Sequence, residues 1–414
     1  MRNIVLVTID SLRADHCGFM GYERNTTPTL DTMAADGLVF ENAIAPGPRT
    51  PESMPAIFTG KYPSTLNAGL PSLLSSHGDM TRDHMQARQT IADRFSKRGF
   101  TTGGFTPNPY TSRYFGFNKG FDYFEDFITG DVIPRNLPAP LRVVNQYINK
   151  ERKFKPWESY IDSITSWVKS VDEPYFLWIM PMDVHTPYLT PSDYRTYNKW
   201  WETLYANWWY WRQNHNNENI EIRQRLINAY DDTIRYVDEF LTSLADSLSE
   251  SDPVFVICAD HGEAFGEHGT YGHQQQLYNE NLHVPFVIAN SSKTGSIRET
   301  ISLRKLGYII RNILLNEAPM SSVVEEESEN IVIAKTSRGP TVAVMTNSVK
   351  YISNPSCKPE FYKTRSDSRE ENDISEQITD SVNLFEELCR CHIQSESEQR
   401  LLQMAVKSFN TVNL

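Results

Sequence analysis

The chain has 414 residues, of which 39% are hydrophobic, so it can bury a large core and form two unequal lobes. Its net charge of −12 and the lack of any basic run argue against nucleic acid as the main partner. No apolar run approaches the ~18 residues of a membrane span, and five scattered cysteines make no disulfide framework. Because no secretory signal precedes the first strand, we expect a cytoplasmic protein.

Strand-like and helical segments alternate along most of the chain. The alternation predicts an α/β fold with a mostly parallel, doubly wound sheet flanked by helices. Buried strands are predicted over residues 3–9, 38–45, 101–106, 175–180 and 253–259. Helices are predicted over residues 27–35, 90–97, 157–171 and 218–248.

The last part of the chain changes character after about residue 331. Short strand-like pieces at 331–335, 341–345 and 349–352 predict a small antiparallel sheet. A helix is predicted from about 378 to 406. We therefore expect a main domain over residues 1–325 and a small C-terminal subdomain with a terminal helix over residues 326–414.

A hydroxyl stands directly before a proline at the start of the segment RTPESMPAIFTGKYP, residues 49–63. Pro51 suits the first helical position, which places Thr50 at the N-cap. A phosphate or sulfate ester docked there would meet free N–H donors and a hydroxyl placed to attack it. Thr-Pro also opens many ordinary helices, so this segment alone indicates only a cap.

Two predicted strands end on carboxylates. The first strand runs into Asp10, and the strand at 253–259 runs into Asp260 and His261. Open α/β sheets place their sites at such strand ends, so we expect these side chains to meet. Carboxylate and neutral imidazole together suit Zn²⁺ or Mn²⁺. Taken singly, each residue could instead be a cap, a turn residue or a hydrogen-bonded histidine.

Together these segments resemble the sulfatase family of the alkaline phosphatase superfamily, in order along nearly the whole chain. The opening IVLVTIDSLRADHCGFMGY resembles the first strand and metal-binding Asp, and the segment after Arg49 resembles the nucleophile signature, with Thr50 at the nucleophile. CADHGEAFGEHGTYGH resembles the second metal segment. Further matches lie in FGFNKGFDYF at 115–124, DVHTPY at 183–188 and the block at 349–374. The resemblance implies that residues 1–325 form a catalytic domain for ester hydrolysis.

The departures from that family bear on the chemistry. Thr50 carries a β-methyl group and cannot be oxidised to the formylglycine of standard sulfatases. Glu52 and Met54 replace the usual Pro and Arg, and Ser11 stands where many members have a second Asp. A Thr ester cannot release sulfate by elimination, so an acceptor must attack the bound group directly, and phosphoryl groups accept such attack readily. We therefore expect a Thr-nucleophile variant that favours phosphoesters over sulfate esters.

The resemblance also implies a metal centre. We expect one divalent ion (Mn²⁺, Zn²⁺, Ca²⁺ or Mg²⁺) held by Asp10, Asp260 and His261, with the Thr50 hydroxyl as a further ligand. A second ion stays open. Thr50 is then the attacking group, activated by metal contact.

Several other polar residues are candidates for the same site. The candidates to protonate the leaving oxygen are His185, His268 and His273. Lys61 and Arg13 are candidates to orient the site or bind its anion, and each could instead form a salt bridge. Asn108 and His185 open loops that we expect to contact the substrate.

Three kinds of function remain open: a hydrolase of small-molecule or glycan phosphate or sulfate esters, a phosphoglycerol-type transferase, and a binding protein without catalysis. Five tryptophans between residues 200 and 211 could stack a sugar or glycerol headgroup, close over the site, pack as a helical insertion or mediate self-association. The sequence leaves the oligomeric state open.

Overall fold

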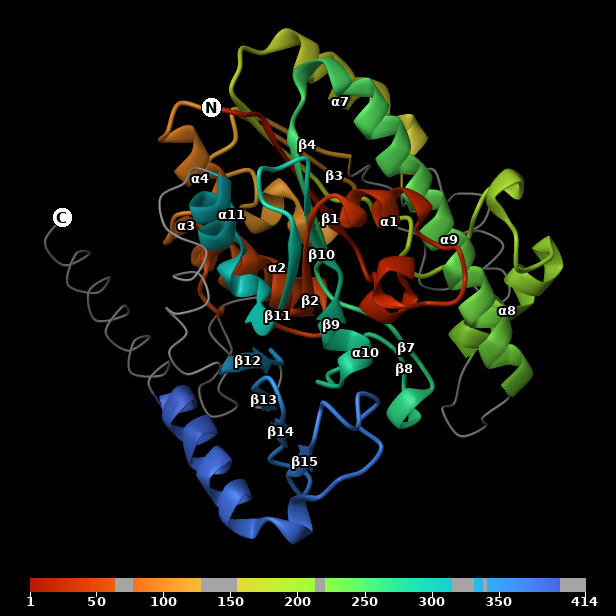
Figure 1. The fold of residues 1–414 in the computed structure, drawn as a ribbon, viewed down its shortest axis with the longest axis vertical. Helices are drawn as coiled ribbons and strands as arrows, with labels where there is room; N and C mark the ends of the chain where they lie inside the picture. The colour runs from red at the N-terminus through yellow and green to blue at the C-terminus, as the bar shows by residue number, and fades with distance from the viewer. Residues whose placement is uncertain (64–76, 128–154, 213–219, 315–330, 338–340, 395–414) are drawn as a thin grey trace, which may run out of the picture.

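The computed structural model describes residues 1–63, 77–127, 155–212, 220–314, 331–337 and 341–394. A nine-stranded sheet lies at its centre, in the order β11-β2-β10-β6-β1-β5-β3-β4, with β9 paired to β2 (Figure 1). The strands are β1 Ile4–Ile9, β2 Leu38–Ile44, β3 Thr101–Thr106, β4 Tyr123–Asp126, β5 Tyr175–Ile179, β6 Val254–Ala259, β9 His283–Val284, β10 Phe286–Ala289 and β11 Gly295–Ser302. All neighbours from β6 to β4 are parallel, whereas β10 runs antiparallel to β2 and β6. The predicted fold class is thus confirmed.

The central strands β1, β5 and β6 are buried along their whole length because helices cover both faces of the sheet. Every residue of β1 and β6 is buried. Figure 1 shows α1 and α9 on one side of the sheet and α3, α4 and α11 on the other. The helices are α1 Pro28–Ala35, α2 Thr50–Thr59, α3 His77–Gln86, α4 Ile91–Ser96, α7 Ile161–Ser170, α8 Trp200–Arg212, α9 Ile220–Ser247, α10 Asn279–Leu282 and α11 Leu306–Leu314.

The predicted helices differ from the observed ones mainly at their ends. The helix predicted over 157–171 is a 3₁₀ turn, Trp157–Ser159, followed by α7. The helix predicted over 90–97 is α4, which begins with a capping box: the Thr90 hydroxyl accepts from the Asp93 N–H at 3.0 Å, and the Asp93 carboxylate accepts from the Thr90 N–H at 2.9 Å. None of the helices in the described ranges combines the length and apolarity needed to cross a membrane.

The C-terminal part forms the predicted antiparallel sheet, in the order β12-β13-β14-β15, with a helix over residues 379–394 beside it (Figure 1). The strands are β12 Val332–Lys335, β13 Val342–Met345, β14 Lys350–Ser353 and β15 Glu360–Tyr362. Phe385 of the helix packs against Tyr351 and Phe361 of the sheet. The predicted domain boundary after 325 and the predicted helix beyond 394 lie outside the described residues.

A buried ion pair joins the small sheet to the main domain. The ammonium group of Lys350 lies 2.7 Å from the Glu370 carboxylate, and both side chains are fully buried. Each also bonds Asn279 at the start of α10: the ammonium donates to the Asn279 side-chain oxygen at 3.1 Å, and the carboxylate accepts from its N–H at 2.8 Å. The two parts of the molecule are therefore connected by charge as well as by apolar packing.

Replacing Lys350 by Ala should lower the free energy of unfolding by about 3–5 kcal/mol, because it leaves the Glu370 carboxylate buried without its counter-charge. Urea unfolding at neutral pH measures the change. Lys358→Ala is the matched control, since the Lys358–Glu376 pair is 86% and 82% exposed and its loss should cost less than about 1 kcal/mol. Equal stability of the two variants would contradict the conclusion that the buried pair contributes to the free energy of unfolding.

Candidate active site

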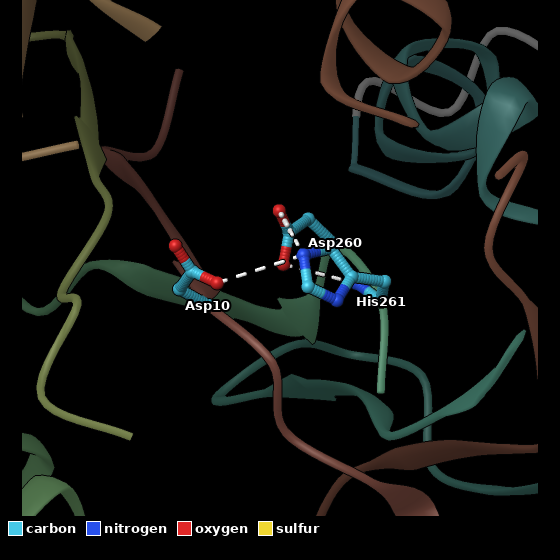
Figure 2. Close-up of side chains that lie close together, drawn as sticks. All are labelled: Asp10, Asp260 and His261. Carbon is cyan, nitrogen blue, oxygen red and sulfur yellow. Dashed lines mark hydrogen bonds and ion pairs between the residues drawn. The ribbon is translucent and has the colours of Figure 1, made fainter. Parts of the chain in front are cut away.

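Three acidic and imidazole side chains meet where two adjacent strands end. Asp10 follows β1, and Asp260 and His261 follow β6, which pairs in parallel with β1 up to Ile9 and Ala259. One ligand atom from each of the three side chains lies within 4.8 Å of the others, and all three side chains are buried (Figure 2). The parallel register of β1 and β6 thus brings the predicted residues Asp10, Asp260 and His261 together.

The two neighbouring carboxylates are both harder to ionise in this site than in water. Burial, and then the neighbouring Asp260, raise the pKa of Asp10 above its ordinary value. Burial likewise raises the pKa of Asp260 to about 7. In water-free surroundings such a pair needs nearby positive charge or donors to stay ionised.

The His261 ring is oriented by a local hydrogen bond. Its Nδ1–H donates to the Gly262 carbonyl at 2.8 Å, so the lone pair lies on Nε2. Nε2 lies 3.6 Å from an oxygen of Asp10, 3.5 Å from Oδ2 of Asp260 and 3.3 Å from the Thr50 hydroxyl. Burial lowers the pKa of His261 to about 4, which keeps the ring neutral and able to bind a metal.

The geometry of these side chains fits a divalent cation. Oδ2 of Asp260 is buried and accepts no hydrogen bond, although buried carboxylate oxygens are nearly always paired. Two carboxylates and one neutral imidazole form a donor set suited to Zn²⁺ or Mn²⁺. A cation bound between Asp10, Asp260 and His261 would satisfy that oxygen and relieve the repulsion between the carboxylates.

Helix α2 brings the Thr50 hydroxyl to this cluster. The helix begins at Thr50 with Arg49 as its N-cap, so the predicted position of Thr50 at the N-cap was wrong by one residue. The Ser53 hydroxyl donates to the Asp260 carbonyl at 2.6 Å and fastens the first turn of the helix to the end of β6. Thr50 is 5% exposed, at the positive end of a ten-residue helix.

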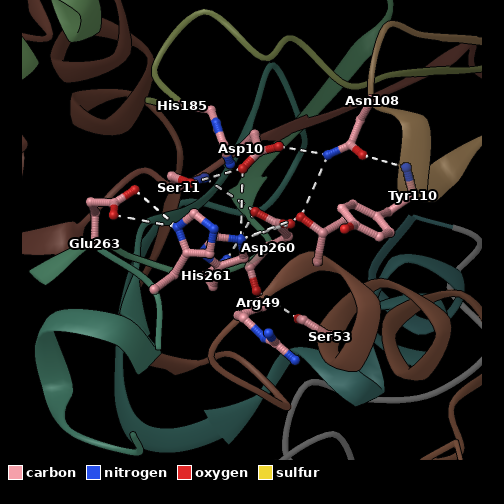
Figure 3. Close-up of polar contacts among 12 residues, drawn as sticks. Asp10, Ser11, Arg49, Ser53, Asn108, Tyr110, His185, Asp260, His261 and Glu263 are labelled. Atoms are coloured by element: carbon pink, nitrogen blue, oxygen red, sulfur yellow. Dashed lines mark hydrogen bonds and ion pairs between the residues drawn. The ribbon is translucent and has the colours of Figure 1, made fainter. Parts of the chain in front are cut away.

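Asn108 links the nucleophile candidate to the metal candidate (Figure 3). It follows β3, and its side-chain amide donates to Asp10 at 2.6 Å and lies 3.5 Å from the Thr50 hydroxyl. The amide is held in that direction because its oxygen accepts from the Tyr110 N–H at 2.8 Å. Asn108, which was predicted to contact the substrate, therefore lies beside both Asp10 and Thr50.

Two of the candidate histidines lie beside His261. The ring of His273 lies 4.9 Å from both His185 and His261, measured between ring centroids. Nδ1 of His273 contacts the buried Glu263 carboxylate at 3.2 Å. Burial alone would lower the pKa of His273, but the Glu263 charge outweighs it and holds the pKa above its ordinary value. His273 is therefore oriented to carry a proton next to the cluster.

Two predicted cations occupy other roles. Lys61 is exposed and follows the C-terminal end of α2, whereas Thr50 lies at the N-terminal end. A ten-residue helix is ~15 Å long. The assignment of Lys61 to the site was therefore wrong. The Arg13 guanidinium is buried and bonds the Asp15 carboxylate at 2.7 and 2.8 Å and Glu267 at 3.0 Å. Of the two alternatives given for Arg13, the structure shows the salt bridge.

His268 lies away from the cluster. Its Nδ1 contacts Glu280 at 2.8 Å, its Nε2 contacts the Glu370 carbonyl at 3.0 Å, and its ring stacks on Tyr278 at 3.6 Å. Both nitrogens are thus engaged between the main domain and the C-terminal part. Burial lowers the pKa of His268, but the Glu280 carboxylate overcomes it and raises the pKa to about 9. This arrangement disfavours His268 as the group that protonates a leaving oxygen.

Three further residues support the site: Ser11 and Glu52, which the sequence marked only as departures from the family, and Tyr230, which no motif predicted. Ser11 adopts φ 63°, a left-handed conformation that is uncommon for serine, and its hydroxyl donates to Asp10 at 2.8 Å. The Tyr230 hydroxyl, from α9, donates to the Ser11 carbonyl at 2.7 Å and fixes this turn. Glu52, which replaces the family's usual Pro, is buried and pairs with Arg49. No sequence motif could have identified Tyr230, because its partner Ser11 lies more than two hundred residues away in the chain.

The comparison with protein families decides the identity. A family model described as Sulfatase matches residues 2–309, which include every residue of the cluster. The chain belongs to the sulfatase family. Asp10, Asp260 and His261 are the candidate metal ligands of this sulfatase-family protein.

Relatives of this sulfatase-family protein act on different groups. An arylsulfatase of Clostridium perfringens is 26% identical over 350 residues, which cover 69% of this chain and 68% of the relative. Human iduronate 2-sulfatase is 22% identical, with 72% of this chain and 61% of the relative covered. Phosphoethanolamine transferase EptA of Escherichia coli is 25% identical over 284 residues, 65% of this chain and 42% of the relative. The chain thus spans less than two thirds of the latter two.

Solved structures confirm the fold of this sulfatase-family protein. The phosphonate monoester hydrolase of Agrobacterium radiobacter superposes with a TM-score of 0.65 at 15% identity and covers 96% of both chains. A 2-O GAG sulfatase gives a TM-score of 0.65 at 16% identity, covering 96% of this chain and 93% of the other. The shared architecture extends over the C-terminal sheet as well as the main domain.

Adding Mn²⁺ or Zn²⁺ to metal-stripped protein should raise the melting temperature by a few degrees, because an ion that binds only the folded state stabilises it. Asp260→Asn should abolish this response, since it removes one of two carboxylate ligands. Differential scanning fluorimetry with and without metal measures both. Asp246→Asn, an exposed acid on α9, is the control and should respond like the wild type. A full response in Asp260→Asn would contradict the assignment.

His268→Gln should lose stability only where His268 is protonated in the folded protein. The raised pKa means that the contribution is complete below the ordinary pKa of 6.5 and disappears as pH rises through about 9. Urea unfolding should therefore show a less stable variant at about pH 6 and a closing gap at about pH 10. Turnover of a small ester should stay at the wild-type value. A large fall in kcat without loss of stability would instead support His268 as the residue that protonates the leaving oxygen.

Proposed function

We propose that this sulfatase-family protein hydrolyses phosphoesters in preference to sulfate esters, with Thr50 as the nucleophile. The carrying observation is the place of the Thr50 hydroxyl: at the first turn of α2, 3.3 Å from Nε2 of His261 and 3.5 Å from the Asn108 amide. A substrate anion docked there meets the positive end of a helix and the attacking oxygen together.

The chain's own residues supply the remaining roles. A divalent ion held by Asp10, Asp260 and His261 would polarise the ester and lower the pKa of the Thr50 hydroxyl. Asn108 orients that hydroxyl and donates to Asp10. The Thr50 hydroxyl loses its proton to solvent water, its oxygen attacks the phosphorus in line, and the bond to the leaving oxygen breaks. The leaving oxygen takes a proton, which His273 is placed to supply because Glu263 holds its ring and favours its protonated form.

The preference for phosphorus follows from the chemistry of threonine. Formylglycine releases sulfate by elimination, and threonine cannot form that aldehyde. The Thr50 ester must therefore be released by attack of water or another acceptor, a reaction that phosphoryl groups undergo readily with metal help. The hydrogen bond from Ser53 to the end of β6 keeps the first turn of α2, and with it an ester on Thr50, beside the candidate metal ligands.

A transferase is the second candidate. It is favoured by the likeness to phosphoethanolamine transferase EptA, which extends over 65% of this chain. In that case the acceptor that resolves the Thr50 ester would be an alcohol, such as a sugar hydroxyl, instead of water. The two functions share every step up to the covalent ester and differ only in what attacks it.

Thr50→Ala should lower the turnover of p-nitrophenyl and bis-p-nitrophenyl phosphate by about 10³-fold or more, because the covalent ester cannot form without the hydroxyl. Thr32→Ala, an exposed threonine in α1, is the matched control and should keep full activity. Initial rates with Mn²⁺, Zn²⁺, Mg²⁺ or Ca²⁺ are measured beside p-nitrophenyl sulfate.

Each alternative has its own signature in this assay. Faster cleavage of the sulfate ester would overturn the preference for phosphorus. Retained turnover in Thr50→Ala would remove Thr50 as the nucleophile. A rate that rises with added glycerol, with phosphoglycerol as the product, would favour the transferase over the hydrolase.

A further inference from the structure

The first turn of α2 carries a buried acid whose one carboxylate oxygen accepts three hydrogen bonds. Glu52 is 3% exposed and lies two residues after Thr50. Its Oε1 accepts from the Arg49 guanidinium, from the Ser337 hydroxyl and, at 3.0 Å, from the Gln275 amide. Its Oε2 accepts from Nε of Arg49 at 3.2 Å. The three donors come from segments that are far apart in the chain.

Each donor belongs to a different part of the molecule. Arg49 is the N-cap of α2, so its bonds to Glu52 close the first turn of that helix. Gln275 lies two residues after His273, whose ring lies beside the candidate metal ligands. Ser337 lies two residues after the end of β12, in the C-terminal part. We call Glu52 and these three partners the Glu52 junction.

The backbone packs closely around the Glu52 junction. The Lys335 N–H donates to the Pro46 carbonyl at 3.0 Å, which ties β12 to the loop before α2. A Cβ atom at Gly47 would lie 2.5 Å from Cβ of Glu52 and 2.9 Å from the Lys335 carbonyl oxygen. Only glycine at position 47 therefore lets the loop, the helix and the strand approach one another this closely.

The charge of Glu52 is balanced within the Glu52 junction. An acidic side chain in the first turn of a helix weakens the attraction of that helix end for a substrate anion. The Arg49 guanidinium bonds both carboxylate oxygens and offsets this charge. Sulfatases usually carry proline at this position, and proline offers no side-chain hydrogen bond. In this chain the position instead joins three segments.

We propose that Glu52 is a positioning residue that holds the Thr50 turn and the His273 segment at a fixed spacing, with the C-terminal sheet as the third support. The proposal rests on the proposed function, in which Thr50 attacks the ester and His273 protonates the leaving oxygen. Glu52 acts through Arg49 and Gln275, which bond it directly. A misplacement of about 1 Å between reacting groups can lower a rate by about 10²-fold, so this spacing matters for turnover.

Steady-state kinetics with two phosphate esters test the proposal. p-Nitrophenolate leaves without a proton, whereas the leaving oxygen of phenyl phosphate benefits from one. Glu52→Gln should lower kcat for both esters by about 10- to 100-fold and leave KM within about threefold of the wild-type value, because it loosens the Thr50 turn. Gln275→Leu should lower kcat for phenyl phosphate about tenfold more than kcat for p-nitrophenyl phosphate, because it loosens the His273 segment.

Two further variants complete the kinetic test. Ser337→Ala removes the third donor and leaves the other members of the Glu52 junction in place, so it should lower kcat for both esters by a smaller factor, about threefold to tenfold. Glu387→Gln is the matched control. Glu387 pairs with Arg390 at the same three-residue spacing, but the two side chains are 52% and 69% exposed, so this variant should keep wild-type kcat for both esters.

Amide hydrogen exchange followed by mass spectrometry detects the Glu52 junction without any turnover. Glu52→Gln should speed exchange in residues 50–56, 271–277 and 332–337 together and leave the strands of the central sheet at the wild-type rate. A wild type that turns over neither ester, with this pattern of exchange in the variant, would overturn the proposed function and leave the junction standing.

Other results overturn the proposal for Glu52 itself. Wild-type kcat for both esters in Glu52→Gln would do so, and faster exchange confined to residues 50–56 would make Glu52 a local helix cap. If Glu52→Gln exchanges faster along the whole chain and melts at a lower temperature, Gln275→Leu and Ser337→Ala decide, because neither removes a charge. Equal kcat losses for the two esters in Gln275→Leu, or none in either variant, would then leave Glu52 a purely structural residue.

Discussion

The structure of the site depends on one electrostatic constraint: two carboxylates, Asp10 and Asp260, are buried side by side. Parallel pairing of β1 with β6 forces this closeness, because both strands end at the same edge of the sheet. Burial raises the pKa values of both carboxylates, and the neighbouring Asp260 raises that of Asp10 further. The surrounding hydrogen-bond donors offset part of the cost of burying these carboxylates. The buried oxygen of Asp260 that lacks a hydrogen bond marks where a cation fits.

The donors around the carboxylates come from distant parts of the chain. Asn108 arrives from the end of β3 and donates to the Asp10 carboxylate, and Ser53 arrives from α2 and donates to the Asp260 backbone carbonyl. Ser11 is held in a left-handed conformation by Tyr230 of the long helix α9. Since each donor also anchors its own element to a strand end, the elements that stabilise the fold are the ones that position Thr50 and the metal candidate. A change that loosens one of them acts on both stability and chemistry.

The roles of the histidines are decided by a short hairpin. Strands β7 (Ala264–Phe265) and β8 (Tyr271–Gly272) pair antiparallel, with Ala264 opposite Gly272. This pairing returns His273 to the side of Glu263, next to the metal candidate, and leaves His268 at the tip of the hairpin, against the C-terminal part. Five residues of sequence thus separate His273, which lies beside the metal candidate, from His268, which joins two parts of the fold.

The sequence by itself determined the α/β class, the buried strands and the trio Asp10, Asp260 and His261, because these follow from local apolar runs that end in polar residues. It also excluded formylglycine at Thr50, since the β-methyl group of threonine prevents oxidation to that aldehyde. Only the tertiary structure decided which of the other polar residues reach the centre. Helix α2 carries Lys61 away from its own first turn, and Arg13 is committed to carboxylates. Such pairings join residues far apart in the chain, so no local pattern encodes them.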